Sequence, residues 1–157
     1  MFKKVHAYFS SYCDNTKLNL NYSMLFIVEG FFDVLKLYQF GFLGVSTMGH
    51  SSISARRRGL LFRYFLDLHR FSELTGQNVS GKIVVLGDGD SAGRKYANTL
   101  YKELKSDFLR VGMCICPSGK DPADFENKEE FVKFLAEQGI EINGINKTVI
   151  DNAKETS

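Results

Sequence analysis

Tryptophan is absent from this chain of 157 residues, and proline occurs only twice. Phenylalanine and tyrosine, with 14 and 7 residues, therefore supply all of the aromatic packing. Cysteine is scarce as well, because Cys13, Cys114 and Cys116 are odd in number and are not spaced as CxxC pairs. This spacing argues against a disulfide framework and against a zinc ribbon. It predicts reduced thiols in a cytoplasmic compartment.

Strong net charge and long apolar runs are also lacking. The net charge is only +2 at pH 7, so any binding to nucleic acid must come from local patches and not from a field over the whole molecule. No apolar run approaches the length of a membrane span, and the N-terminus lacks the layout of a signal peptide. We therefore expect no membrane association. The length is suited to one domain with its own hydrophobic core.

Short apolar runs alternate with amphipathic segments along most of the chain. Runs typical of buried strands occupy residues 24–28, 42–46, 83–86 and 109–116. Helical periodicity follows each run, over residues 31–40, 56–68, 91–105 and 127–138. This alternation predicts an α/β fold with a central, mostly parallel four-stranded sheet flanked by helices. The expected organisation is a lead-in at 1–23, one domain at 24–138 and a polar tail at 139–157.

The first predicted helix has a clear apolar spacing. Phe31, Val34, Leu35 and Tyr38 stand at i, i+3, i+4 and i+7, and we expect them on its buried face. Asp33 lies in the first turn of the same helix. Its carboxylate either faces the end of the preceding strand or compensates the helix dipole.

Carboxylates follow three of the four predicted strands. Glu29 comes directly after the first, Asp88 and Asp90 come after the third, and Asp121 lies in the loop after the fourth. Because parallel strands end at one edge of a sheet, we expect these side chains to gather there. Gathered carboxylates repel one another unless a cation is present, and Mg²⁺ prefers carboxylate oxygens together with retained water. The pattern predicts a divalent-cation site, although a solvated acidic turn is the alternative for the Asp88–Asp90 pair taken alone.

Several positions near this edge are candidates for contact with phosphate. Gly49 belongs to a Gly/Ser-rich loop at 47–54 that either holds a phosphate through its backbone N–H groups or only connects two elements. Arg57 belongs to a triple arginine that opens a helix against its dipole, so it contacts phosphate or forms part of a solvated basic face. Arg94 and Lys95 stand near the acidic turn, where each binds phosphate or forms a salt bridge.

Three segments together resemble the motifs of the Toprim domain, most of all in its bacterial-primase branch. They read VEGFFDV at 28–34, LGDGDSAGR at 86–94 and PSGKDP at 117–122, and STMG at 46–49 is similar to the family's serine-leucine-glycine loop. The likeness covers about residues 24–136. The resemblance implies the Rossmann-like Toprim fold. It also implies the making or breaking of phosphodiester bonds with Mg²⁺ or Mn²⁺.

The resemblance also implies roles for individual residues. Glu29 would be the general acid/base or a metal ligand, and Asp88 and Asp90 would hold the metal. Asp33 and Asp121 would complete the acidic cluster. Contacts to substrate phosphate or nucleic acid are expected from Gly49, Arg57, Arg94, Lys95 and Lys120.

The chain departs from the primase pattern in two ways. Many primases carry an aspartate directly after the aspartate-proline pair, and here Ala123 takes that position with Asp124 one residue later. This difference bears on a third metal position. The first 23 residues also cannot supply the basic subdomain that precedes Toprim in a bacterial primase, and the cysteine spacing excludes its zinc module. We therefore expect a split or phage-type primase subunit, a stand-alone enzyme or a cut piece of a longer chain.

The sequence supports three hypotheses of function. The first is the nucleotidyl-transfer core of a primase-type RNA polymerase, acting on a single-stranded DNA template and nucleotides in a bacterial or phage-infected cytoplasm. Its partners would be a replicative helicase or a separate zinc-binding or basic primase subunit. The second is a small stand-alone nuclease that acts on DNA or structured RNA. The third is a non-catalytic accessory that binds nucleic acid or a helicase. A topoisomerase is disfavoured because it needs a nucleophilic tyrosine on another domain.

Overall fold

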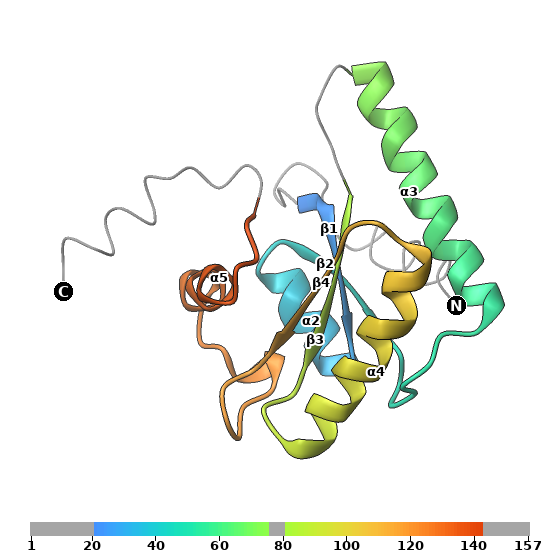
Figure 1. Cartoon of the computed structure of the whole chain (residues 1–157). Coiled ribbons are helices and arrows are strands. Elements are labelled where there is room, and N and C mark those ends of the chain that lie inside the picture. Colours follow the sequence, from blue (N-terminus) through green and yellow to red (C-terminus); the bar gives the residue numbers. More distant parts are fainter. Residues whose placement is uncertain (1–20, 76–80, 143–157) are drawn as a thin grey trace.

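One parallel sheet organises the molecule (Figure 1). The structure is a computed structural model, and it describes residues 21–75 and 81–142. Its four strands lie in the order β2-β1-β3-β4, and their pairings are parallel. The strands are β1 (Asn21–Val28), β2 (Phe42–Ser46), β3 (Lys82–Gly87) and β4 (Val111–Ile115). The predicted α/β fold is confirmed. Most of the predicted lead-in and the tail beyond residue 142 lie outside the described residues.

Helices cover both faces of the sheet. They are α2 (Phe31–Gln39), α3 (Ala55–Thr75), α4 (Ser91–Asp107) and α5 (Lys128–Glu137), with a short 3₁₀ helix η1 (Pro122–Asp124) before α5. Helices α2 and α5 pack on one face, whereas α3 and α4 pack on the other (Figure 1). Each parallel connection passes through a helix, as the geometry of parallel strands requires. None of the described helices has the length and apolar character needed to cross a membrane.

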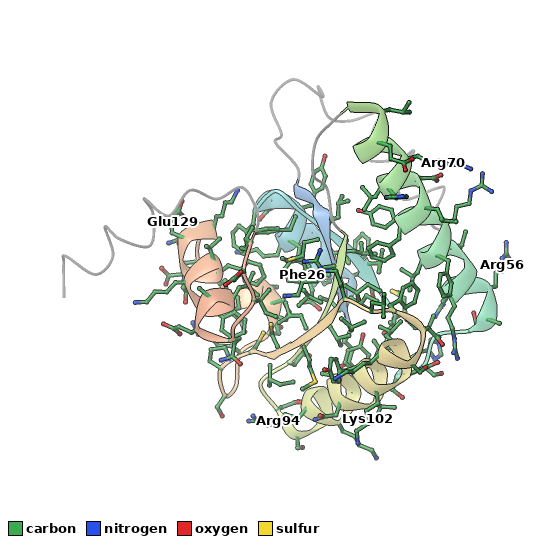
Figure 2. All side chains as sticks on the ribbon, turned by 45° about the horizontal axis from the view of Figure 1, so that its top comes forward. Phe26, Arg56, Arg70, Arg94, Lys102 and Glu129 are labelled. Carbon is green, nitrogen blue, oxygen red and sulfur yellow. The ribbon has the colours of Figure 1, made fainter. Side chains whose placement is uncertain are left out.

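The two central strands are buried on both sides, as their continuous apolar runs predict. The four apolar residues of β3, from Ile83 to Leu86, are each 0% exposed. Phe26 of β1 lies at the centre of one face, with its ring 5.4 Å from that of Phe42 and 5.7 Å from that of Phe131 (Figure 2). Since no tryptophan is present, a cluster of phenylalanine rings fills this face.

Helix α2 differs from its predicted orientation. Phe31 is 48% exposed, whereas Asp33, Val34 and Leu37 are buried. The carboxylate of Asp33 accepts a hydrogen bond from the backbone N–H of Gly30 at 2.9 Å. This cap fixes the first turn with the aspartate inward, so the predicted burial of Phe31 is wrong and that of Val34 is confirmed.

The inner faces of the later helices agree with their spacing. In α4, Tyr96, Leu100 and Leu104 are buried. In α5, Asn127 caps the helix by accepting the backbone N–H of Glu130 at 2.8 Å. The apolar periodicity of these segments therefore gives the packing directly, because no buried polar residue competes with it there.

Candidate functional site

The acidic side chains gather where β1 and β3 end. Ile27 pairs with Val85 in the sheet, and this register places Glu29 level with Gly87, directly before Asp88. The loop that follows β4 reaches the same edge, because the backbone N–H of Gly89 donates to the carbonyl of Lys120 at 2.8 Å. The carboxyl ends of three strands thus meet at one rim, which we call the acidic rim and which carries Glu29, Asp33, Asp88, Asp90 and Asp121.

Asp88 is the most perturbed group of the acidic rim. Burial, followed by the negative charges of Asp33, Glu29, Asp121 and Asp90, raises the pKa of Asp88 to about 6. Its Oδ1 atom is buried and has no hydrogen-bond partner in the described part of the chain. A desolvated carboxylate oxygen without a donor is destabilising unless a proton or a cation accompanies it. The Oδ1 atom of Asp88 is therefore suited to take up a proton or to bind a cation.

Two glycines explain how the chain presses Asp88 into this position. A Cβ atom on Gly89 would lie 1.8 Å from the carbonyl oxygen of Pro117, and one on Gly93 would lie 2.6 Å from the backbone N and O of Asp88. Backbone therefore packs against backbone on both sides of the turn, and only glycine leaves room for it. The acidic turn is held between the start of α4 and the loop after β4.

The other three aspartates begin helices. Asp33 caps α2, Asp90 accepts the N–H of Gly93 at 2.6 Å at the start of α4, and Asp121 accepts the N–H groups of Ala123 at 2.8 Å and Asp124 at 3.1 Å. Burial raises the pKa of Asp33, while its bond to Gly30 opposes that rise. Backbone N–H groups therefore fix the orientation of these three carboxylates at the starts of the helices.

The geometry limits how an ion would bind. In residues 21–75 and 81–142, no three carboxylate, imidazole or thiol groups are placed to hold one ion together. The capping bonds account for this, since each turns a carboxylate oxygen toward the backbone. Mg²⁺ keeps several waters and takes one or two carboxylates together with substrate phosphates. The unpartnered oxygen of Asp88, with Glu29 and Asp90 beside it, fits an ion of that kind.

Glu29 is placed by its backbone. Its carbonyl oxygen accepts the hydroxyl of Ser46 at 2.7 Å and the N–H of Gly49 at 3.3 Å. Among the described residues, no hydrogen bond or ion pair engages its carboxylate. The N–H of Gly49, expected from the sequence to face a phosphate, is thus already used. Met48 and Gly49 adopt φ values of 56° and 79°, so the backbone turns through the left-handed region at this point of the loop.

The predicted basic residues differ in the contacts that they make. Arg94 donates to the carbonyl of Gly89 at 3.2 Å and stands at the start of α4 (Figure 2). Lys95 is exposed beside it, and Arg57 is half-buried in the first turn of α3. Lys120 forms an ion pair with Glu130 at 3.2 Å. Arg94 is therefore the basic residue in direct contact with the acidic turn.

Two arginines of the predicted triple have different surroundings. Arg58 donates to Glu103 at 2.7 Å and to Asp107 at 2.9 Å on α4, so its charge ties α3 to α4. Arg56 projects from α3 at the periphery of the molecule (Figure 2). The misfit with the helix dipole is thus partly explained by structure, since Arg58 is paired.

A hydroxyl pair at the acidic rim was not foreseen. The hydroxyl of Thr47 donates to the phenolic oxygen of Tyr96 at 2.9 Å, and both side chains are buried. The apolar periodicity over residues 91–105 places Tyr96 on the inner face of the helix but gives no partner for its hydroxyl. One signal was present: a buried tyrosine hydroxyl needs a polar partner, and the loop at 47–54 was rich in hydroxyls.

The two described cysteines do not join this chemistry. Cys114 and Cys116 are buried free thiols. Burial raises the pKa of Cys114 to about 12 and that of Cys116 further, and the acidic rim adds to the rise at Cys116. They are inert thiols packed in the core.

Comparison with known proteins gives a consistent result. The family model described as Toprim-like matches residues 26–126, which is more than half of the chain. A DNA primase of Aquifex aeolicus is 27% identical over 132 residues, covering 82% of this chain and 24% of the relative. The chain therefore spans about a quarter of that protein's length.

Solved structures agree on the fold. A DNA primase domain from Pseudomonas aeruginosa has a TM-score of 0.56 and 26% identity, covering 76% of this chain and 34% of that one. The RNA polymerase domain of Mycobacterium tuberculosis primase, solved in complex with double-stranded DNA, has a TM-score of 0.53 and 21% identity, covering 73% and 34%.

Proposed function

Because this chain belongs to the Toprim-like family, as its match over residues 26–126 shows, we propose that it carries out metal-dependent phosphodiester chemistry on nucleic acid. More specifically, we propose that it is the nucleotidyl-transfer core of a primase-type RNA polymerase in DNA replication. The observation that carries the proposal is the buried, unpartnered Oδ1 of Asp88 among four other carboxylates. Such an oxygen suits a divalent cation and has no other partner in the described residues.

Each residue of the acidic rim has a role in this proposal. Asp88 and Asp90 hold Mg²⁺ or Mn²⁺, and Glu29 adds a ligand or accepts a proton. When bound, the ion neutralises charge on the transferring phosphoryl group and lowers the pKa of a bound hydroxyl. Asp33 and Asp121 deepen the negative potential that attracts the ion, while their caps keep the helix starts in place.

The carboxylate of Glu29 is the group best placed to move a proton. It has no hydrogen-bond partner in the described residues, and it stands beside the metal-binding turn. It would take the proton of the attacking sugar hydroxyl, as a general base does. The hydroxyl oxygen would then bond to the α-phosphorus of a nucleoside triphosphate, while the bond from that phosphorus to pyrophosphate breaks and pyrophosphate leaves. The phosphates of nucleotide and nucleic acid would be held by Arg94 first and then by Arg57, Lys95 and Lys120.

The substrates and partners follow from the same proposal. A primase-type core takes nucleoside triphosphates and a single-stranded DNA template. The proposed partners are a zinc-binding or basic primase subunit or a replicative helicase, which would share in binding the template. The compartment would be the cytoplasm of a bacterium, or of a bacterium that carries a phage.

One assay separates the candidate activities. The protein is incubated with Mg²⁺ or Mn²⁺, single-stranded DNA and labelled ribonucleotides, with and without a helicase and a primase zinc-binding subunit. Labelled oligonucleotides are expected, and Glu29→Gln should reduce their rate by about 10²–10⁴-fold, the range for loss of a general acid/base. Glu137→Gln, at an exposed position of α5, is the control with the same change of charge.

Each alternative gives a different product. Shortened strands that depend on Glu29 would replace the polymerase by a nuclease acting on DNA or structured RNA. The absence of both products under every metal and partner condition, with nucleic-acid binding intact, would mean a non-catalytic accessory.

A further inference from the structure

The two halves of the acidic rim come from distant parts of the chain. Glu29 follows β1, whereas Asp88 and Asp90 lie between β3 and α4. The carboxylate of Glu29 has no hydrogen-bond or ion-pair partner in the described residues, so its position is set by the position of the Glu29 backbone. That backbone is held by the loop after β2, through Ser46 and Gly49. Whatever fixes this loop therefore fixes Glu29.

Thr47 anchors the loop in three directions. Its N–H donates to the carbonyl of Val28 at 3.0 Å, and its own carbonyl accepts the N–H of His50 at 3.3 Å. Its hydroxyl donates to the phenolic oxygen of Tyr96 at 2.9 Å. The side chain is only 4% exposed. The first two bonds lie within the β1–β2 region, and the third reaches across to α4.

Tyr96 belongs to the half of the rim that carries the aspartates. It lies in α4, whose start is capped by Asp90 and whose Gly93 contacts Asp88. The pKa of the phenol is raised by burial and then by the negative charges of Glu29, Asp88 and Asp33, while its bond to Thr47 opposes the rise. The hydroxyl thus lies within the field of the acidic rim and stays neutral, so it adds no further negative charge.

A second hydrogen bond between this loop and α4 lies farther from Glu29 along the chain. Ile53 donates its N–H to the carboxylate of Glu103 at 3.3 Å, six residues beyond Thr47 and close to the start of α3. It anchors the helix that follows and not the backbone of Glu29. Of these two contacts, the hydroxyl pair lies nearer to Glu29, and it acts in addition to the strand pairing that places Glu29 level with Gly87.

We propose that the Thr47–Tyr96 hydroxyl pair is a positioning device that fixes Glu29 relative to Asp88 and Asp90 and so sets the affinity for a divalent cation. This inference rests on the proposed function. Packing alone does not need these hydroxyls, because valine and phenylalanine would fill nearly the same volume and a matched apolar pair is close to neutral in stability. A hydrogen bond adds what apolar contact lacks, namely a preferred distance and direction.

The test uses four variants and two measurements. Thr47→Val and Tyr96→Phe each remove one hydroxyl, the double variant removes both, and Thr47→Ser keeps the hydroxyl. Urea unfolding without metal should show a lower midpoint in Thr47→Val and Tyr96→Phe, because each leaves a buried hydroxyl unpaired, and a recovered midpoint in the double variant. Calorimetric titration with Mn²⁺ should show affinity about tenfold weaker in both single variants and in the double variant, as for residues that orient metal ligands. Thr47→Ser should bind Mn²⁺ as the wild type does.

The outcomes are distinct. If the double variant recovered both its urea midpoint and its Mn²⁺ affinity, the pair would be structural only and the positioning role would be overturned. If Thr47→Ser weakened Mn²⁺ binding as strongly as Thr47→Val, the hydroxyl would not be the cause, and the role would again be overturned. If the wild-type chain bound no Mn²⁺, the proposed function would fail and the inference with it.

Discussion

The turn after β3 and the loop after β4 lie against each other, but they treat their carboxylates differently. In the loop, Asp121 accepts two backbone N–H groups and Lys120 pairs with Glu130. In the turn, Asp88 keeps a buried oxygen that has no partner among the described residues. The loop is satisfied by the protein itself, so it can serve as a brace. The turn keeps the oxygen that we propose as a ligand for a divalent cation.

The difference shows that the charges of the acidic rim are not equivalent. Carboxylates that cap helices stabilise the fold and also contribute negative potential. Burial and then the charges of its neighbours raise the pKa of Asp88, so its ionised form is unfavourable in the metal-free fold. Substitutions in the two regions should therefore have opposite effects on stability and effects of different size on metal binding.

The largest effect is expected from Asp88→Asn. This change removes the perturbed charge at nearly constant volume, so affinity for Mn²⁺ should fall by about 100-fold or more. The metal-free protein should become more stable to urea, because repulsion within the acidic rim is relieved. Asp67→Asn, at an exposed site of α3, is the control with the same change of charge. Calorimetry and urea unfolding measure the two effects, and a destabilised Asp88→Asn that still bound Mn²⁺ tightly would reverse the comparison.

The brace is tested by Gly89→Ala. The new Cβ would meet the carbonyl oxygen of Pro117 at 1.8 Å, and backbone must move to relieve the clash. We expect a loss of about 3 kcal/mol in the free energy of unfolding, at the upper end for overpacking. Gly59→Ala in α3 has open space around it and should instead gain about 0.5–1 kcal/mol. Equal effects of the two changes would show that the turn does not press on the loop.

A smaller effect is expected at the cap of η1. Asp121→Ala removes the acceptor of two N–H groups and should lower the free energy of unfolding by about 1 kcal/mol, whereas Asp121→Asn keeps the cap and should be near neutral. Mn²⁺ affinity should fall less in Asp121→Asn than in Asp88→Asn, because Asp121 contributes mainly potential. Urea unfolding and calorimetry of the two variants test this. A larger loss of affinity at Asp121 would make the loop, not the turn, the main ligand region.

The sequence predicted the alternation of strands and helices along the chain and the position of the carboxylates at one edge of the sheet. Continuous apolar runs such as that of β3 have few alternatives to a buried parallel strand. It failed at α2, because the capping bond of Asp33 overrode the apolar spacing that favoured Phe31. It also missed the bond between Thr47 and Tyr96, which are 49 residues apart. Such a contact depends on how two elements are packed, and periodicity along one element does not carry that information.

The stability of the metal-free protein should also depend on pH. The folded-state pKa of Asp88, at about 6, lies above its ordinary value of 3.8. The folded state therefore holds this proton more tightly than the unfolded state, and metal-free stability should fall as pH rises from about 4 to about 6 and then level off. The urea midpoint of wild type minus that of Asp88→Asn, measured across this range, isolates the contribution. This difference should decrease as pH rises, and an increase with pH would contradict the raised pKa of Asp88.

The central claim is that a divalent cation binds the buried, unpartnered oxygen of Asp88. Thermal unfolding at increasing Mg²⁺ concentration tests it most directly, since a ligand at 100 times its Kd stabilises the native state by about 2.7 kcal/mol. The wild type should show a melting temperature that climbs with Mg²⁺, while Asp88→Asn should start higher and stay nearly level. If both proteins shifted equally, or if neither shifted, the acidic rim would not be a metal site.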